Sequence, residues 1–241
     1  MSLHFAIIAA GEGSRMVQEG VAVPKPLVDL DGRPMIRRLI DVMAAQDPAS
    51  ISVIVNEQMT QVADYLRSLS ATVPLRLVIR TTPGSLHSLA AVTEGLQGKV
   101  IATTVDTIFR PDEFAAYADS FARARDVDAL MGVTDFIDDE KPLYVDTDLH
   151  MRVTAFTDTP PASGARYISG GIYGLDEAAL SLARRCCDCG VTRMRDYQRS
   201  LLVAGLRVEA CAMTKIIDVD HAADIEAARQ LLSASNPTTQ P

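Results

Sequence analysis

The sequence predicts an α/β fold, in a single three-layer domain with a mostly parallel central sheet and a small antiparallel extension. Strand-like apolar runs alternate with amphipathic helical patterns through the first half of the chain, as in proteins with helices on both faces of a parallel sheet. Of the 241 residues, 48% are hydrophobic and 22% are charged, which is the balance of a globular protein. Because no repeat or linker divides the chain, we expect one domain at residues 1–232 and a disordered tail at 233–241.

The expected strands are short apolar runs, nearly continuous in the first half of the chain, as in strands buried on both faces of a sheet. In that half they lie at residues 5–10, 51–55, 75–79, 100–105 and 129–133. The second half is less regular. There we expect a hairpin at 144–145 and 151–153, with an acidic turn at 146–149, and further strands at 172–175, 206–212 and 215–219.

The expected helices carry apolar residues at helical spacing. One begins with Pro34, whose fixed φ suits the first turn, and continues through Met43. Others are expected at residues 58–69, 85–96, 112–125 and 221–232, with two more helical stretches between the strands at 172–175 and 206–212. Glycine-containing loops are expected around Ser163–Gly164 and Ser169–Gly171.

The charge balance and the short apolar runs argue against several classes of function. Lys and Arg number 23 against 31 Asp and Glu, so the formal charge is −8. Without a net positive field, we expect no general binding to nucleic acid or to an anionic membrane. No apolar run approaches the roughly 18 residues of a membrane span, and Met1 to Ile8 has neither a basic leader nor a small-residue cleavage site. We therefore expect a cytoplasmic protein with reduced cysteines.

The stretch that carries most chemical information directly follows the first strand. It is Ala9-Ala10-Gly11-Glu12-Gly13-Ser14-Arg15-Met16, and Pro24-Lys25-Pro26-Leu27 comes soon after it. Glycines let the backbone turn sharply and present N–H groups to an anion. Arg15 and Lys25 add two cations, so the pattern predicts a phosphate-binding loop. The alternative is that the glycines only turn the chain and the cations face solvent.

Two familiar glycine motifs do not fit this loop. A Walker-type phosphate loop ends in Gly-Lys-Ser/Thr, whereas Gly13 is followed by Ser14-Arg15. The dinucleotide fingerprint needs a small residue at the position of Met16, and no helical pattern begins there. A different phosphate-binding family is therefore expected.

Three stretches together resemble the signature of the sugar nucleotidyltransferases, also called nucleoside-diphosphate-sugar pyrophosphorylases. They are Ala9 to Met16, Pro24 to Leu27 and Gly32 to Ile36. The resemblance implies a Rossmann-like, GT-A-like nucleotidyltransferase domain. It also implies Mg²⁺-dependent transfer of a nucleoside monophosphate from a nucleoside triphosphate to a sugar 1-phosphate, with release of pyrophosphate.

The same resemblance implies roles for individual residues. Arg15 and Lys25 would be catalytic, because they would stabilise the phosphates during transfer. The nucleotide would be held by the glycine-containing loop and by the segment Thr81 to Ser88, where such enzymes contact the base and ribose. The residues implied are Ala10, Gly11, Gly13, Ser14, Gly84 and Ser85. Ser85 could instead cap the helix that begins there.

Three aspartates are the candidate metal ligands. Asp106 follows the strand at 100–105, at the carboxyl end where open α/β sheets bind ligands. Asp218 and Asp220 alternate along a short strand, so both point to one side. The resemblance implies that Asp106 and one or both of these hold Mg²⁺, which prefers carboxylate oxygens. Alternatively, Asp106 caps a turn or helix and Asp220 caps the final helix.

A second glycine pair is the candidate for acceptor binding. Gly170 and Gly171 lie in a segment that resembles the Gly-Gly-Ile-Tyr strand bordering the sugar-phosphate pocket of this family. Close approach of a ligand would explain both glycines, and a β-bulge would explain them as well.

Two further clusters have simpler explanations than metal binding. Cys186, Cys187 and Cys189 are spaced more closely than the cysteines of typical zinc sites. Asp146 and Asp148 resemble the Asp-x-Asp of metal-dependent glycosyltransferases, but a hairpin turn favours the same residues.

Several functions remain open at this point. The same chemistry could act on an alcohol phosphate, as in cytidylyltransferases, or on a molybdenum cofactor precursor. A metal-dependent glycosyltransferase would need an Asp-x-Asp where this chain has Asp106-Thr107-Ile108. A non-catalytic nucleotide- or sugar-phosphate-binding protein is the third alternative. The sequence does not predict the base, the acceptor or the oligomeric state.

Overall fold

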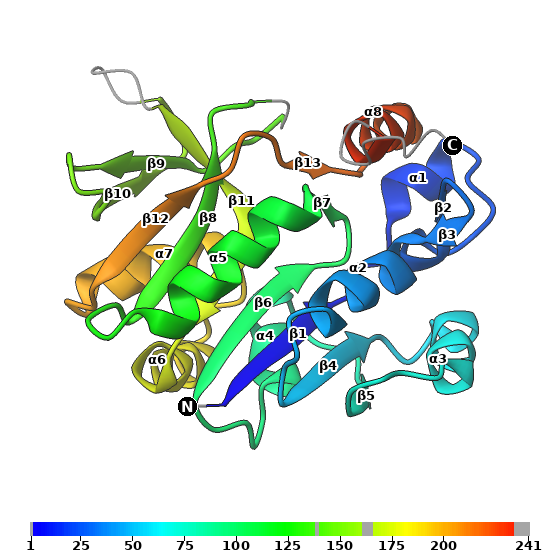
Figure 1. Ribbon diagram of the computed structural model, residues 1–241, viewed down its shortest axis with the longest axis horizontal. Coiled ribbons are helices and arrows are strands. Elements are labelled where there is room, and N and C mark those ends of the chain that lie inside the picture. The colour runs from blue at the N-terminus through cyan, green and yellow to red at the C-terminus, as the bar shows by residue number, and fades with distance from the viewer. Residues whose placement is uncertain (1, 138–139, 161–165, 234–241) are drawn as a thin grey trace, which may run out of the picture.

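The structure is a computed structural model that describes residues 2–137, 140–160 and 166–233. Its centre is a large mixed sheet with helices on both faces, as Figure 1 shows. This three-layer α/β arrangement confirms the predicted fold class. The expected loop at Ser163–Gly164 and residues 234–241 of the expected tail lie outside the described residues, and Ser233 is the last residue of a helix.

Four parallel strands form one half of the sheet. Their spatial order is β5 (Leu75–Ile79), β4 (Ser50–Val55), β1 (Leu3–Ile8) and β6 (Lys99–Thr104). Ile8 pairs with Ile54 of β4 and with Thr104 of β6, so these strands end almost level. Loops that follow them therefore meet at one edge, where ligands bind in open α/β sheets.

The other half of the sheet contains the antiparallel pairs. The long strand β11 (Tyr167–Leu175) lies antiparallel to β6 and to β8 (Ala129–Thr134), and β12 (Val208–Ala212) runs parallel to β8. A hairpin of β9 (Tyr144–Thr147) and β10 (Val153–Thr157) extends from the start of β11. Inside its turn, Asp148 Oδ1 accepts from the N–H groups of His150 and Arg152, which confirms the turn interpretation for Asp148. Asp146 was also expected in the turn, but it lies within β9 and pairs with Ala155.

Six helices cover the two faces of the sheet. The helices on one face are α2 (Met35–Ala44), α3 (Thr60–Ser68) and α5 (Pro111–Arg123). Those on the other are α4 (Ser85–Val92), α6 (Glu177–Asp188) and α7 (Met194–Val203). Phe5 and Ile7 of β1 pack into the first core, while Ala6 and Ile8 pack into the second. Because both faces of β1 are buried, its sequence is a continuous apolar run.

A smaller core lies next to the carboxyl ends of the parallel strands. It packs residues 14–34, 107–108 and 217–233 against one another. Its elements are α1 (Ser14–Gln18), the 3-10 helix η1 (Lys25–Leu27), β2 (Asp29–Leu30), β3 (Arg33–Pro34), β7 (Thr107–Ile108), β13 (Ile217–Asp218) and α8 (Ala222–Ser233). Met16, Leu30, Val219 and Leu232 are buried together there. The core therefore holds the glycine-containing loop beside the acidic segment that precedes α8.

The structure corrects two local expectations. A helix does begin after Gly13, and Met16 is buried as its apolar anchor. The expected loop at Ser169–Gly171 is instead part of β11, where the register against β8 shifts between Ser169 and Ile172. The glycines thus form a β-bulge, and Gly171 adopts a φ of 73° that favours glycine. None of the helices built from the described residues is both long and apolar enough to cross a membrane.

Candidate functional site

A cleft of about 600 Å³ lies at the carboxyl ends of β1, β4, β5 and β6. Its volume falls in the range typical of small-molecule sites. It is lined by all six predicted nucleotide-binding residues, which are Ala10, Gly11, Gly13, Ser14, Gly84 and Ser85. Arg15, Lys25, Asp106 and Asp220 line it as well. Residues predicted from four distant parts of the sequence are therefore brought together.

The loop after β1 has free hydrogen-bond donors. Among the described residues, no acceptor is found for the backbone N–H groups of Gly11 to Ser14. Gly13 is left-handed, with φ 61°, and ends the loop at the start of α1. A Cβ at Gly13 would lie 2.9 Å from Cβ of Lys25. The glycine is therefore required both by its backbone conformation and by the close approach of Lys25.

We expect Gly13→Ala to destabilise the protein by about 1–2 kcal/mol, because alanine strains a left-handed backbone. Turnover should fall as well, since the new methyl group displaces Lys25. Urea denaturation and steady-state kinetics measure the two effects. Gly11→Ala is the matched control, because a Cβ at Gly11 would meet no atom within 4 Å. Equal stability of the two variants would contradict the role given to Gly13.

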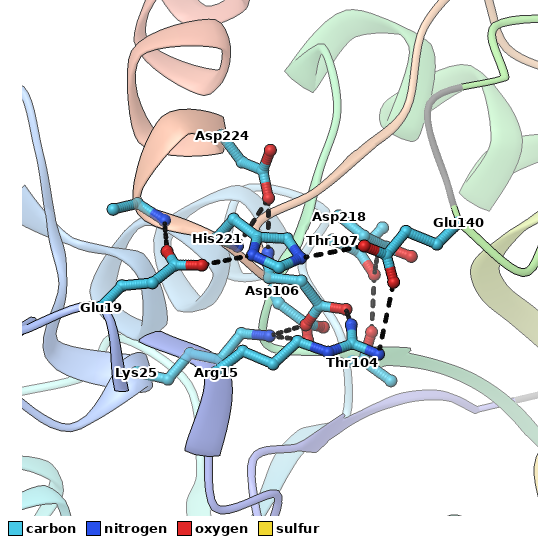
Figure 2. Close-up of polar contacts among 12 residues, drawn as sticks. Arg15, Glu19, Lys25, Thr104, Asp106, Thr107, Glu140, Asp218, His221 and Asp224 are labelled. Carbon is cyan, nitrogen blue, oxygen red and sulfur yellow. Dashed lines mark hydrogen bonds and ion pairs between the residues drawn. The ribbon is translucent and has the colours of Figure 1, made fainter. Parts of the chain in front are cut away.

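A buried lysine lies at the centre of the site. Lys25 is 8% exposed, and its Nζ donates to Oδ2 of Asp106 at 2.6 Å and to Oδ1 of Asp220 at 2.5 Å. Arg15 Nη1 donates to the other oxygen of Asp220 at 2.8 Å. Figure 2 shows Lys25 and Arg15 extending side by side, with the ammonium of Lys25 directed toward Asp106. Two cations and two carboxylates thus form one charged cluster.

The electrostatics keep Lys25 and Asp220 ionised. Burial acts to lower the pKa of Lys25, but the charges of Asp106 and Asp220 and their hydrogen bonds outweigh it, so the pKa is raised. Burial acts to raise the pKa of Asp220, but the hydrogen bond and charge of Lys25 and the charge of Arg15 outweigh it, so that pKa is lowered. At neutral pH the lysine and the carboxylate are therefore both charged.

A second, smaller hollow adjoins the cleft. It is lined by Ser169, Gly170 and Asp218, among others, and its volume is about 60 Å³. Arg15 and Asp220 line both spaces. The charged cluster therefore lies where the cleft and the smaller hollow meet.

The two C-terminal aspartates differ in their surroundings. Asp220 reaches Lys25, whereas Asp218 Oδ1 accepts from Thr107 Oγ1 at 3.2 Å and lines only the smaller hollow. The side chain of Asp220 is thus engaged in the site. The turn before α8 is held by Asp224, whose Oδ2 accepts from the N–H groups of Asp220 and His221.

Packing explains part of the glycine and serine pattern. A Cβ at Gly84 would lie 2.6 Å from the carbonyl oxygen of Thr192, and Ser85 Oγ accepts from the N–H of Met194 at the start of α7. Ser85 therefore caps α7 and not its own helix. A Cβ at Gly170 would collide with Ile216, and one at Gly171 would lie 2.7 Å from Thr107 Oγ1. Gly171 lines neither space.

Sequence reasoning missed two polar residues of the cleft, Asn56 and Gln58. Asn56 is 7% exposed and directly follows β4; its Nδ2 donates to the carbonyl oxygen of Ala10 at 3.1 Å. A polar residue at the carboxyl end of a buried strand was the available signal. Glu19 and His221 were also missed. Glu19 Oε1 lies 2.5 Å from His221 Nδ1, and this hydrogen bond raises the pKa of His221.

The donor set fits a magnesium ion. Asp106 Oδ1 is buried and has no hydrogen-bond partner in the described part of the chain, so this carboxylate has an oxygen available for a ligand. Within the same residues, no three His, Cys, Asp or Glu side chains form a ready cluster. Mg²⁺ commonly binds one or two carboxylates together with substrate phosphates, so Asp106 and Asp220 are sufficient.

The comparisons with known proteins agree with this geometry. The family described as the MobA-like NTP transferase domain matches residues 5–169. The chain is 39% identical over 66 residues to the bifunctional protein GlmU of Neisseria gonorrhoeae, which covers 27% of the chain and 14% of GlmU. It is 28% identical over 190 residues to GlmU of Mycobacterium bovis, which covers 73% of the chain and 37% of that protein. The matches thus span well under half of these relatives.

Two solved structures share the fold over nearly the whole chain. One is the inositol-1-phosphate CTP transferase from T. maritima, with a TM-score of 0.79 and 17% identity, covering 99% of this chain and 98% of the other. The second is a Bacillus anthracis protein assigned as a glucose-1-phosphate thymidylyltransferase, in complex with a sucrose. Its TM-score is 0.82 at 18% identity, covering 100% of this chain and 98% of the other.

Proposed function

The chain belongs to the MobA-like NTP transferase domain family, and from this premise we propose that it is a cytoplasmic, Mg²⁺-dependent nucleotidyltransferase that acts on a sugar 1-phosphate. It would transfer a nucleoside monophosphate from a nucleoside triphosphate and release pyrophosphate. The observation that carries the proposal is the cluster of Arg15, Lys25, Asp106 and Asp220 where the cleft and the smaller hollow meet. Its two cations can pair with anionic phosphates, and its two carboxylates can hold a metal ion between them.

The reaction requires the protein mainly to position the two substrates and to stabilise charge. An oxygen of the acceptor phosphate attacks the α-phosphorus in line, and the bond from this phosphorus to the bridging oxygen of pyrophosphate breaks. The attacking phosphate is already an anion, so no nucleophile or strong base from the protein is needed. Catalysis then comes from orienting the two substrates and from stabilising the charge that develops during transfer.

Different residues of the cleft would bind the triphosphate and stabilise the transferred group. The free N–H groups of Gly11 to Ser14 and the guanidinium of Arg15 would bind the triphosphate. Lys25 would stabilise the charge on the transferred phosphoryl group. Asp106 and Asp220 take two of the three N–H donors of its ammonium, which leaves the third for a phosphate oxygen.

Asp106 and Asp220 are the proposed holders of Mg²⁺. When bound, the ion supplies positive charge that draws the two phosphates together and polarises the group in transfer. The free Oδ1 of Asp106 supports this assignment. Asp220 is favoured over Asp218, because Asp220 pairs with the lysine that also pairs with Asp106, and because it lines the cleft.

The smaller hollow is the proposed place of the acceptor. Ser169 and the carboxylate of Asp218 line it and can hydrogen-bond sugar hydroxyl groups. Gly170 lines it also, whereas Gly171 would act only through the bulge. An alcohol phosphate is the second candidate, favoured by the fold shared with the inositol-1-phosphate CTP transferase.

The test is pyrophosphate release in the presence of Mg²⁺. The common nucleoside triphosphates are crossed with sugar 1-phosphates, inositol 1-phosphate, choline phosphate and a molybdenum cofactor precursor. Strong pyrophosphate release with one sugar 1-phosphate supports the proposal. Release only with an alcohol phosphate would mean that the acceptor is an alcohol phosphate and not a sugar 1-phosphate. Nucleotide binding by calorimetry without release for any pair would favour a binding protein.

A further inference from the structure

Two of the four charged groups of the site, Arg15 and Asp220, lie on short segments from distant parts of the sequence. Arg15 lies on α1, a helix of five residues, and Asp220 lies in the turn between β13 and α8. Helices this short are unstable by themselves. The relative placement of Arg15 and Asp220, which are 205 positions apart in the sequence, must therefore come from contacts between the segments.

The ion pair between Arg15 and Asp220 is not a suitable link. Both side chains are almost half exposed, at 49% and 43%, and exposed ion pairs hold segments together weakly. Arg15 is also expected to bind the triphosphate under the proposed function. Because its guanidinium would then be shared with the substrate, the pair of Arg15 with Asp220 is not an independent link between the two segments.

Glu19 makes a link that does not involve the substrates. It directly follows α1, and its N–H donates to the carbonyl oxygen of Arg15. Its Oε2 accepts from the N–H of Ala222, the first residue of α8, at 2.7 Å, and its Oε1 lies 2.5 Å from Nδ1 of His221. Figure 2 shows the Glu19 carboxylate reaching His221 at the start of α8.

The far side of this link is itself anchored to the metal-binding region. The N–H of Val219 donates to the carbonyl oxygen of Asp106 at 3.0 Å, and β13 pairs with β7. Asp224 holds the turn through the N–H groups of Asp220 and His221. Asp106 and Asp220 therefore form one unit through the backbone, and Glu19 connects the helix of Arg15 to that unit.

We propose that Glu19 is a positioning residue, whose carboxylate fixes α1 on the N-terminus of α8 and so keeps Arg15 in register with Asp220 during nucleotidyl transfer. The inference rests on the proposed function. Glu19 contacts no reacting group in this arrangement. Its effect should appear as lost alignment, which lowers kcat more than it changes KM for the acceptor.

The test compares Glu19→Ala, Glu19→Gln and wild type by kcat, acceptor KM and melting temperature, and by calorimetry with Mn²⁺ and inorganic triphosphate as the probe. For Glu19→Ala we expect kcat to fall about tenfold to a hundredfold, with acceptor KM within about twofold. Its affinity for the Mn²⁺–triphosphate probe should be about tenfold weaker. Glu19→Gln keeps an oxygen for the N–H of Ala222, so its kcat should stay within about threefold of wild type.

Glu226→Ala is the matched control, because Glu226 is a carboxylate of α8 that pairs within its own helix. It should behave as wild type. The inference is overturned if Glu19→Ala keeps the kcat and the probe affinity of wild type. It is also overturned if Glu19→Gln loses as much kcat as Glu19→Ala. If Glu19→Ala does not fold, Ala222→Pro removes the N–H that donates to Glu19 while proline suits the first helical position, and a wild-type kcat there has the same meaning.

Failure of the proposed function is recognised separately. A wild-type protein that binds the probe without turnover contradicts the function, and the affinities of the variants then still decide the role of Glu19. A wild-type protein that neither binds the probe nor turns over substrate overturns both the proposed function and the role of Glu19.

Discussion

Lys25→Met is expected to lower kcat by about a hundredfold or more, because it removes a preorganised charge from the site of transfer. The ammonium of Lys25 is almost fully buried and lies between the two carboxylates proposed to hold the metal. Methionine keeps an unbranched apolar stem next to Gly13, so the loop should retain its shape. Steady-state kinetics with the best substrate pair from the pyrophosphate assay give the measurement.

Lys99→Met provides the control for burial of a lysine. Lys99 is 7% exposed, but its Nζ donates to the carbonyl oxygens of Phe121 and Ala124 at the end of α5, far from the cluster. We expect this variant to lose stability and to keep the kcat of its folded fraction. Near-normal kcat in Lys25→Met would remove Lys25 from the catalytic role.

Asp106→Asn is expected to abolish the response to Mg²⁺ and to lower kcat by about a thousandfold, since a metal contributes several kcal/mol of charge stabilisation. The amide is nearly the same size as the carboxylate, but it is neutral and is a poorer ligand for a hard cation. It also leaves Lys25 with Asp220 as its one carboxylate partner in the described structure. The measurement is kcat as a function of Mg²⁺ concentration.

The two C-terminal aspartates make the metal assignment testable. If Asp220 holds the ion with Asp106, Asp220→Asn should resemble Asp106→Asn, whereas Asp218→Asn should change acceptor KM more than the Mg²⁺ response. A normal Mg²⁺ titration in Asp106→Asn means that the metal assignment is wrong.

The fold was predictable because its signals are local. The apolar run of β1 packs on both faces of the sheet, and the helix expected from Pro34 corresponds to α2. Sequence reasoning missed the strands β2, β3 and β7. Each has two residues, which is too short to show the alternation of apolar and polar residues that marks a strand. The bulge in β11 was among the explanations expected for Gly170 and Gly171, but the sequence could not separate it from a loop or a close approach of ligand, because all three favour glycine.

The candidate site was predictable only in part. Motif residues such as Gly13, Arg15 and Lys25 were identified because they form a recognisable pattern over a few positions. The contact of Glu19 with Ala222 joins residues 203 positions apart, and that of Asn56 with Ala10 joins residues 46 apart. No local pattern records such pairs. The burial of Lys25 between two aspartates likewise depends on the packing of β7, β13 and η1.

The most direct test of the central claim follows the α-phosphate. The protein is incubated with Mg²⁺, the preferred nucleoside triphosphate labelled with ³²P at the α position, and the preferred acceptor phosphate. The account predicts that the label moves into a product containing the nucleoside monophosphate joined to the acceptor, while the released pyrophosphate is unlabelled. Label that stays in the triphosphate although both substrates bind, or that appears as free nucleoside monophosphate, would contradict nucleotidyl transfer.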